Sequence, residues 1–186
     1  MSRFTVLATP IPDLKLIQRH QLHDSRGFFT RIFCNDELAS IGCSAPITQI
    51  NHSYTQKKGT VRGLHFQAPP QMEHKLVSCL RGAVWDIAVD MRVDSPSFLQ
   101  WFAAELSSGN LMSLCIPPGF AHGFQALTDD CELLYAHTTH YRPDAESGIN
   151  VCDPALNIPW PLPIEFLSIR DHSLPMTDEW VKELNV

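Results

Sequence analysis

The feature that most constrains this chain is an alternation of apolar and polar residues with period two, which runs through the middle of the sequence. It comes in stretches of roughly 5 to 10 residues bounded by Gly, Pro, Asn, Asp and Ser, the pattern of antiparallel strands. Lys75–Leu80 and Ala83–Arg92 flank Arg81–Gly82 and are predicted to form a hairpin. Ser107–Asn110 and Thr128–Asp130 mark two further turns. The chain is therefore predicted to be all-β.

Helical periodicity is scarce. Two short helices are predicted, Asp36–Ile41 with Asn35 as its cap and Gly42 as its end, and Asp178–Leu184 after Thr177. Because no helix of crossover length separates the strands, a sandwich or closed barrel is favoured over a parallel sheet, and a double-sheet jelly roll with short peripheral helices fits best. We expect one domain over residues 1–186, with the Pro-rich tail from Pro154 packed against it.

Composition excludes several classes of protein. The 186 residues are 44% hydrophobic, which suits one globular domain, and the net charge of -6 disfavours nucleic acid as a partner. The apolar run Ala83–Val89 is interrupted by Asp86, so no membrane span is predicted. Met1–Thr5 has no continuous apolar stretch of the kind found in secretory signals, and the cytosol is the expected compartment.

The six cysteines are spread singly, without a C-x-x-C pair that would indicate a zinc knuckle or a redox motif. We expect most of them to be reduced core residues. They are Cys34, Cys43, Cys79, Cys115, Cys131 and Cys152.

Nine histidines are more than packing requires, and several stand in predicted strands. In Arg62–Gln67, alternation places Leu64 and Phe66 on one face and His65 on the other, so His65 could face a barrel interior. One interpretation is a metal site, although no H-x-H occurs and His65, His74 and His122 would have to converge from separate strands. A second is metal-free acid–base chemistry on an anionic substrate.

The residues for acid–base chemistry are all present. Tyr135 stands in the alternating strand Leu133–His137 and could serve as a general acid, and Lys75 begins the predicted hairpin. Arg26, Arg62 and Arg170 each lie next to a turn or a strand end, where their usual role would be solvated charge.

Several longer phrases in the sequence point to one family. They are Asp24–Phe29, Gln49–Ser53, Val61–Gln67, Ile116–Phe124, Asp86–Arg92, Asn150–Leu156 and Ile158–Pro161. Together they resemble the dTDP-4-dehydrorhamnose 3,5-epimerase family over residues from about 10 to 175, and ordered matches of this length are far more specific than one short motif.

The resemblance implies a cupin-type jelly roll, a homodimer with exchanged N-terminal strands, and an active site inside the barrel that uses no metal or other cofactor. It also implies an isomerase of deoxysugar biosynthesis. In this family a nucleotide-linked 4-keto-6-deoxyhexose loses protons from the carbons beside the ketone and regains them on the opposite face.

Positions matched to the family give the expected site. His65 falls on the base, Asp171 on its carboxylate partner, Tyr135 on the general acid and Lys75 on the cation that stabilises the enolate. The expected contacts to the nucleotide or its diphosphate are Arg26, Phe29, Gln49, Asn51, Arg62, His122, Glu146 and Arg170, and an arginine suits a phosphate because its planar fork donates two hydrogen bonds.

Two expected substrate contacts depart from the family. Arg31 replaces the usual glutamate beside the base, and since a guanidinium only donates hydrogen bonds, cytosine or guanine becomes an alternative to thymine unless Arg31 points elsewhere. His140 stands where a tyrosine commonly lines the sugar pocket, which keeps epimerisation at C3 or C5 alone open. A binding protein without activity and a metal-dependent cupin remain further alternatives.

Overall fold

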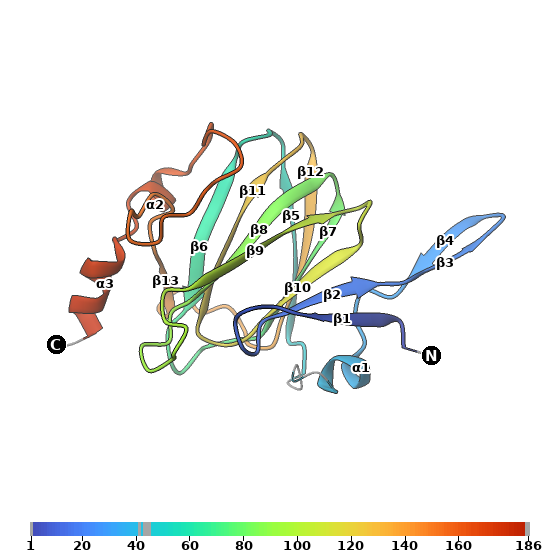
Figure 1. Cartoon of the computed structure of the whole chain (residues 1–186), viewed down its shortest axis with the longest axis horizontal. Helices are drawn as coiled ribbons and strands as arrows, with labels where there is room; N and C mark the ends of the chain where they lie inside the picture. Colours follow the sequence, from blue (N-terminus) through green and yellow to red (C-terminus); the bar gives the residue numbers. More distant parts are fainter. Residues whose placement is uncertain (1, 41, 43–45, 185–186) are drawn as a thin grey trace.

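Two antiparallel sheets face each other in the computed structural model, which describes residues 2–40, 42 and 46–184 (Figure 1). The first sheet has the order β1 (Phe4–Ala8), β2 (Lys15–Arg19), β10 (Met112–Ile116), β7 (Lys75–Arg81), β12 (Cys131–His137) and β5 (Gln49–Thr55). The second has the order β13 (Glu146–Gly148), β6 (Val61–Gln67), β11 (Phe120–Ala126), β8 (Ala83–Asp90) and β9 (Trp101–Ser107). A separate hairpin of β3 (Gln21–Asp24) and β4 (Gly27–Thr30) projects from the first sheet (Figure 1).

The all-β, jelly-roll prediction is confirmed, but the predicted hairpin at Arg81–Gly82 is wrong. β7 and β8 are joined by this turn yet belong to different sheets, where β7 pairs with β10 and β12 and β8 pairs with β9 and β11. The turns after Ser107 and at Thr128–Asp130 also lead from one sheet to the other. Turn residues specify a reversal of the chain, whereas strand pairing is decided by which faces are buried.

The main core lies between the two sheets and consists of aliphatic and aromatic side chains of both. Val77, Leu114 and Leu133 from the first sheet meet Leu106 and Phe124 from the second. Because burial of apolar surface is favourable by roughly 25 cal/mol per Å², this core is the main stabilising contribution. Polar side chains occupy the remaining interior, where they form the cavity described below.

A second cluster covers the outer face of the second sheet. Leu64 and Ile87 of the sheet pack with Trp160 and Trp180 of the C-terminal segment. The Trp160 indole donates a hydrogen bond to the Val151 carbonyl at 3.0 Å. The Pro-rich tail is therefore packed against the sheet, as predicted.

The helices are short and peripheral, as predicted, with three differences of detail. α1 (Asn35–Ala39) is preceded by Cys34, which gives no side-chain cap, so the predicted Asn35 cap is wrong, and Ile41 lies outside the described residues. α3 (Thr177–Leu184) begins one residue earlier than predicted. α2 (Ile169–His172) was not predicted, because four residues are too few to show a period. None of the described helices is long and apolar enough to cross a membrane.

Four cysteines are thiols without a disulfide, and their environments differ: Cys79 and Cys131 are buried, Cys34 is half-buried and Cys152 is exposed. Cys115 is also buried. Cys43 lies outside the described residues. The expectation of reduced core cysteines thus holds for Cys79 and Cys131, whereas Cys152 departs from it because its side chain is exposed.

Candidate active site

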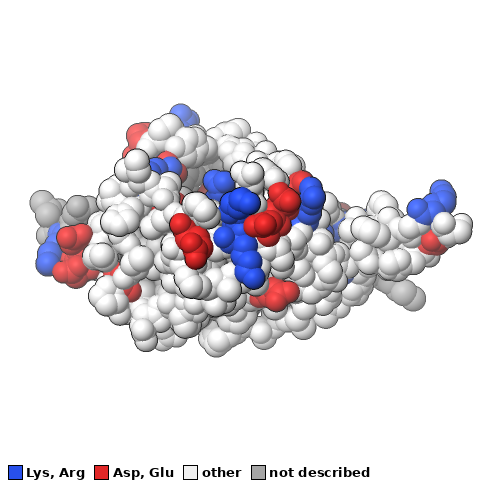
Figure 2. Space-filling model, turned by 90° about the horizontal axis from the view of Figure 1, so that it is seen from above, with Lys and Arg blue, Asp and Glu red and all other residues white. Residues whose placement is uncertain are grey.

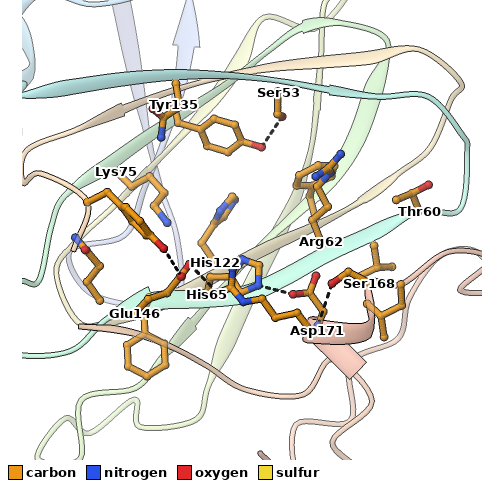
Figure 3. Close-up of a pocket in the computed structure, with 18 of the residues that line it drawn as sticks. Ser53, Thr60, Arg62, His65, Lys75, His122, Tyr135, Glu146, Ser168 and Asp171 are labelled. Carbon is orange, nitrogen blue, oxygen red and sulfur yellow. Dashed lines mark hydrogen bonds and ion pairs between the residues drawn. The ribbon is translucent and has the colours of Figure 1, made fainter. Parts of the chain in front are cut away.

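A cavity of about 810 Å³ opens between the two sheets. The four residues expected to be catalytic all line it, and they come from β6, β7, β12 and α2. Five of the expected substrate contacts line it as well: Asn51, Arg62, His122, Glu146 and Arg170. Figure 3 shows His65 and Asp171 on one side, Tyr135 on the other, and Lys75 and His122 between them.

β6 departs from regular alternation at Gly63, and this departure shapes the site. Arg62 and His65 are three residues apart, so strict alternation would place them on opposite faces. Gly63 has φ +127°, and the pairing of β6 with β11 shifts register opposite it. A Cβ atom on Gly63 would lie 2.6 Å from the Cα of Gly123, which is why glycine is needed there. The irregularity lets both Arg62 and His65 line the cavity.

His65 and Asp171 form a hydrogen-bonded pair. Nε2 of His65 lies 2.7 Å from Oδ1 of Asp171. Oδ2 of Asp171 accepts the Gly63 backbone N–H at 3.4 Å, and the Asp171 N–H donates to the Ser168 hydroxyl at the start of α2. Burial alone would raise the pKa of Asp171, but these hydrogen bonds bring it below its usual value. The carboxylate is thus ionised at neutral pH and fixes the proton of His65 on Nε2, which leaves the lone pair on Nδ1.

Tyr135 lies on β12, in the sheet opposite His65. Its hydroxyl is 3.0 Å from the Ser53 hydroxyl on β5. Burial raises the pKa of Tyr135 well above its usual value, partly offset by the hydrogen bond with Ser53. The phenol therefore keeps its proton over the whole physiological range and can donate it.

Lys75 begins β7, and its side chain is almost fully buried. Burial lowers the pKa of Lys75, against the opposing effect of the Glu73 and Asp86 carboxylates. Its ammonium lies 3.7 Å from Glu73 Oε1. A buried cation of this kind is suited to stabilise a developing oxyanion, because the surroundings screen it less than water would.

A second acid–imidazole pair lies beside Lys75. Nε2 of His122 is 2.9 Å from Oδ2 of Asp86, and both side chains are buried. Burial lowers the pKa of His122, although the Asp86 carboxylate raises it in part. Within the described part of the chain, Oδ1 of Asp86 is the one buried side-chain oxygen or nitrogen that has no hydrogen-bond partner.

The mouth of the cavity carries charged groups. Arg170 lies 2.7 Å from Glu146, which also accepts a hydrogen bond from the Tyr141 hydroxyl at 2.6 Å. Burial works against ionisation of Glu146, but these partners lower its pKa below the usual value. The Arg62 guanidinium donates to the Thr55 hydroxyl at 3.1 Å and to the Tyr54 carbonyl at 3.2 Å, which holds it at the edge of the first sheet.

Three expected substrate contacts lie on the projecting hairpin or directly after it and do not line this cavity. Arg26 pairs with Asp24 at the turn, at 2.6 Å. Phe29 is 62% exposed, and Arg31 forms an ion pair with Glu37 of α1. Figure 2 shows a basic and an acidic side chain side by side near the end of this projection. Gln49 is not a lining residue either, but it donates to Asn51, which is one.

His140 is also absent from the cavity lining, and its neighbour Tyr141 is present instead. β12 ends at His137, so the alternation of the strand does not continue to residue 140. The Tyr141 N–H donates to the Gln49 side chain, which turns Tyr141 toward the cavity mouth. His140 thus does not line this cavity, and its contact with the sugar stays a prediction.

Further polar residues of the site were not identified from the sequence, among them Glu73, Asp86, His137 and Tyr141. Two had a readable signal. Asp86 interrupts an apolar strand and so requires a partner, and His137 follows Tyr135 by two residues on the same face of β12. Among the described residues, no three His, Cys, Asp or Glu side chains come together as a metal site, and His74 does not line the cavity.

Comparison with known proteins connects this geometry to a family. The sequence model of the family described as dTDP-4-dehydrorhamnose 3,5-epimerase matches residues 8–179. The chain is 40% identical to an enzyme of that name from Sinorhizobium fredii, over 92% of each chain.

Two solved structures are similar over nearly the whole chain. One is dTDP-6-deoxy-D-glucose-3,5-epimerase RmlC from Legionella pneumophila in complex with dTDP-4-keto-L-rhamnose, with a TM-score of 0.92, 39% identity and coverage of 97% of this chain and 96% of that one. The other is dTDP-4-dehydrorhamnose 3,5-epimerase from Bacillus anthracis with TDP and PPi bound, with a TM-score of 0.90, 39% identity and coverage of 93% and 99%.

Proposed function

This chain belongs to the dTDP-4-dehydrorhamnose 3,5-epimerase family, and we propose that it inverts C3 and C5 of a dTDP-linked 4-keto-6-deoxyhexose in deoxysugar biosynthesis. The observation that carries this proposal is the placement of an imidazole–carboxylate pair and a phenol on opposite sides of one cavity (Figure 3). Inversion at carbon requires removal of a proton from one face and its return to the other. A base and an acid on facing sheets meet that requirement.

The first step is proton abstraction by His65. Nδ1 takes the proton from the carbon next to the ketone, the electron pair of the C–H bond forms a C=C bond with the carbonyl carbon, and the π pair of the ketone moves onto oxygen to give an enolate. Asp171 holds the imidazole in the required tautomer and stabilises the imidazolium that forms. The Lys75 ammonium stabilises the negative charge on the enolate oxygen.

The second step is proton return by Tyr135. Its hydroxyl donates to the same carbon from the opposite side, and the resulting phenolate regains a proton from solvent while His65 releases one. The high pKa of Tyr135 ensures that it carries the proton before the step. The net reaction exchanges a carbon-bound hydrogen with solvent and changes no oxidation state.

The nucleotide is proposed to be dTDP, held at the mouth of the cavity by Arg62 and Arg170 through its diphosphate. The Legionella relative was solved with a dTDP-linked keto sugar and the Bacillus relative with TDP, which supports this choice. The Arg31 guanidinium pairs with Glu37 of the same chain, so it already has a partner other than a nucleotide base.

The test is solvent exchange. dTDP-4-keto-6-deoxy-D-glucose is incubated with the enzyme in deuterated water, and the deuterium at each carbon is counted by NMR and mass spectrometry. Label at both C3 and C5 with formation of the L-sugar is expected. Label at one carbon would support the single-site alternative, and no label would refute the proposed function in favour of a binding protein.

A homodimer is proposed as the working form. The hairpin β3–β4 projects from the molecule and exposes Phe28 and Phe29 by 61% and 62% (Figure 1). β5 is an edge strand of the first sheet and exposes Ile50 by 62%. Exposed apolar side chains on a hairpin and an unpaired edge favour pairing with another chain. The hairpin would then bring Arg26 and Phe29 to the cavity of the partner subunit.

Mixed dimers test this arrangement. Arg26→Ala and His65→Ala are co-expressed with different tags, and the heterodimers are isolated. If the hairpin serves the partner's cavity, one of the two sites contains both defects and the other has none, so about half of the wild-type activity returns. If each hairpin serves its own chain, both sites keep one defect and activity stays low.

The cytoplasm is the proposed compartment. Cys79 and Cys131 are buried thiols and Cys152 is an exposed one, a state that a reducing compartment maintains. Alkylation of denatured protein taken directly from cells, with and without prior reduction, tests this. Equal thiol counts are expected, and a gain of reactive thiols only after reduction would contradict it.

A further inference from the structure

A relay of polar contacts runs along the cavity lining from the mouth to Lys75, with hydrogen bonds as far as Glu73 and an ion pair as its last link. It starts at the Tyr141 backbone N–H, which lies 3.0 Å from Gln49 Oε1. Gln49 Nε2 is 3.0 Å from Asn51 Oδ1, and Asn51 Nδ2 is 3.4 Å from His137 Nε2. Nδ1 of His137 is 3.0 Å from Glu73 Oε2, whose other oxygen faces the Lys75 ammonium at 3.7 Å.

The direction of this relay follows from its first member. A backbone N–H can only donate, so the Gln49 atom that faces it is the oxygen and the Gln49 nitrogen donates onward. Asn51 must then accept through Oδ1 and donate through Nδ2. His137 accepts on Nε2, so its proton stands on Nδ1 and points at the Glu73 carboxylate. Each contact of the relay thus joins one donor to one acceptor, an arrangement that favours a rigid polar network.

The relay is enclosed at its Lys75 end and exposed at Asn51 and Tyr141. The side chains of Glu73, Lys75 and His137 are only 10%, 12% and 11% exposed. The His137 ring also stacks on Tyr135, with ring centroids 6.2 Å apart and planes 26° from parallel. Gln67 Nε2 adds a weaker contact to Glu73 Oε2 at 3.4 Å. Glu73 and His137 thus contact two residues of the proposed catalytic set without any role of their own in the proposed chemistry.

We propose that Glu73 and His137 are positioning residues, with Glu73 fixing the Lys75 ammonium at the enolate oxygen and His137 fixing Glu73. This inference rests on the proposed function of the same site. It also links the mouth, where Gln49 and Tyr141 lie, to the cation at the reacting carbon. Ordering of Gln49 and Tyr141 at the mouth would thereby hold the Lys75 ammonium in place for the proton transfer.

Glu73 has the additional effect of keeping Lys75 charged. Burial lowers the pKa of Lys75, and the Glu73 carboxylate is the first of the groups that oppose this. The other charged or titratable groups around Lys75 come from five strands: Asp86 from β8, His122 from β11, Tyr135 and His137 from β12, His65 from β6 and Glu146 from β13. Since the pKa of Tyr135 is raised, we assign the alkaline limb of the rate to Lys75.

Glu73→Gln is the first test. The amide keeps the size of the side chain but removes the charge, so the alkaline limb of kcat should move to lower pH by about one unit or more. KM should stay within about threefold, because the nucleotide contacts are intact. Asp178→Asn is the matched control, since Asp178 pairs with Lys182 at 3.1 Å on exposed α3, and it should leave the profile unchanged.

Two His137 variants form the second test and use thermal melting to verify folding. His137→Leu removes the donor to Glu73, and kcat should fall about tenfold to a hundredfold at unchanged KM, as expected for a misplaced catalytic group. His137→Asn can place an amide N–H where Nδ1 stood and should restore kcat to within about threefold of wild type. Equal losses in both variants would overturn the proposal, and so would no loss in either.

An unshifted alkaline limb in a folded Glu73→Gln protein would likewise overturn it. If that variant does not fold, the two His137 variants decide. A wild-type enzyme that exchanges no deuterium would contradict the proposed function instead. In that case ¹⁵N NMR of His137 still tests the relay, since a proton on Nδ1 is expected and a proton on Nε2 would refute it.

Discussion

Asp171→Asn tests the direction of proton transfer most sharply, because the structure determines which way the new amide must face. Asp171 uses Oδ1 for His65 at 2.7 Å and Oδ2 for the Gly63 backbone N–H at 3.4 Å. In the variant, the backbone N–H still requires an acceptor, so the amide oxygen takes the side of Gly63. The amide NH₂ then faces His65 Nε2, which must accept, and the proton of the imidazole moves to Nδ1. The base has lost the lone pair that would receive the substrate proton.

The expected cost follows from the loss of a correctly oriented base. We expect kcat to fall about a hundredfold to ten thousandfold, or about 3 to 5 kcal/mol in activation free energy. KM should change little, since Asp171 is almost fully buried behind His65. Fold should be retained, because the Ser168 cap to the backbone N–H of residue 171 does not involve the substituted group.

The assay is the initial rate of deuterium uptake into dTDP-4-keto-6-deoxy-D-glucose, with thermal melting as the measure of folding. Glu132→Gln is the matched control: Glu132 also pairs with a histidine, His52, at 3.1 Å, but on the surface, and its variant should retain wild-type exchange. A folded Asp171→Asn enzyme with kcat within threefold of wild type would refute the assignment of the tautomer and of the base.

Further predictions concern the acid, the base, stability and the nucleotide. Tyr135→Phe should abolish inversion but leave slow exchange at the carbon that His65 deprotonates; loss of exchange and inversion together would argue against two separate groups. His65→Ala should lower kcat about a hundredfold to ten thousandfold, and wild-type turnover would disprove its role. Burial works against ionisation of Asp90, but hydrogen bonds from Arg92, Ser95 and Ser97 lower its pKa to about 2. This folded-state pKa lies below the unfolded value of about 4. The ionised Asp90 therefore stabilises the fold above pH 4, and this contribution is lost as the pH falls toward 2. Asp90→Asn should therefore unfold about 2 kcal/mol more easily in urea at pH 7 and show a flatter stability curve between pH 4 and 2, and an unchanged curve would contradict this. Calorimetric titration should give the order dTDP tighter than CDP or GDP, and the reverse order would restore the role of Arg31 at the base.

Much of the architecture could be predicted from local pattern. Period-two alternation, frequent turn residues and the lack of long helices specified a two-sheet β fold, because each strand must bury one face. The same alternation placed His65 apart from Leu64 and Phe66, and in the structure His65 lines the cavity and Leu64 joins the outer core, whereas Phe66 contributes to both. The pairing of the strands was harder to predict from the sequence. Arg81–Gly82 has the residue types of a hairpin turn, yet the two strands that it joins belong to different sheets.

The same distinction between local sequence information and tertiary structure applies to the candidate site. By itself the sequence determined which chemical groups are available, since the positions matched to the family supplied an imidazole, a lysine, a phenol and a carboxylate in that order along the chain. Only the tertiary structure decided how these groups lie relative to one another. The irregularity at Gly63 brings Arg62 and His65 to one cavity, and β12 ends before His140, so His140 does not line it. Glu73 and His137, 64 positions apart in the sequence, lie in contact. Side-chain identity is local information, whereas the facing of two sheets depends on burial contributed by the whole chain, which no short segment contains.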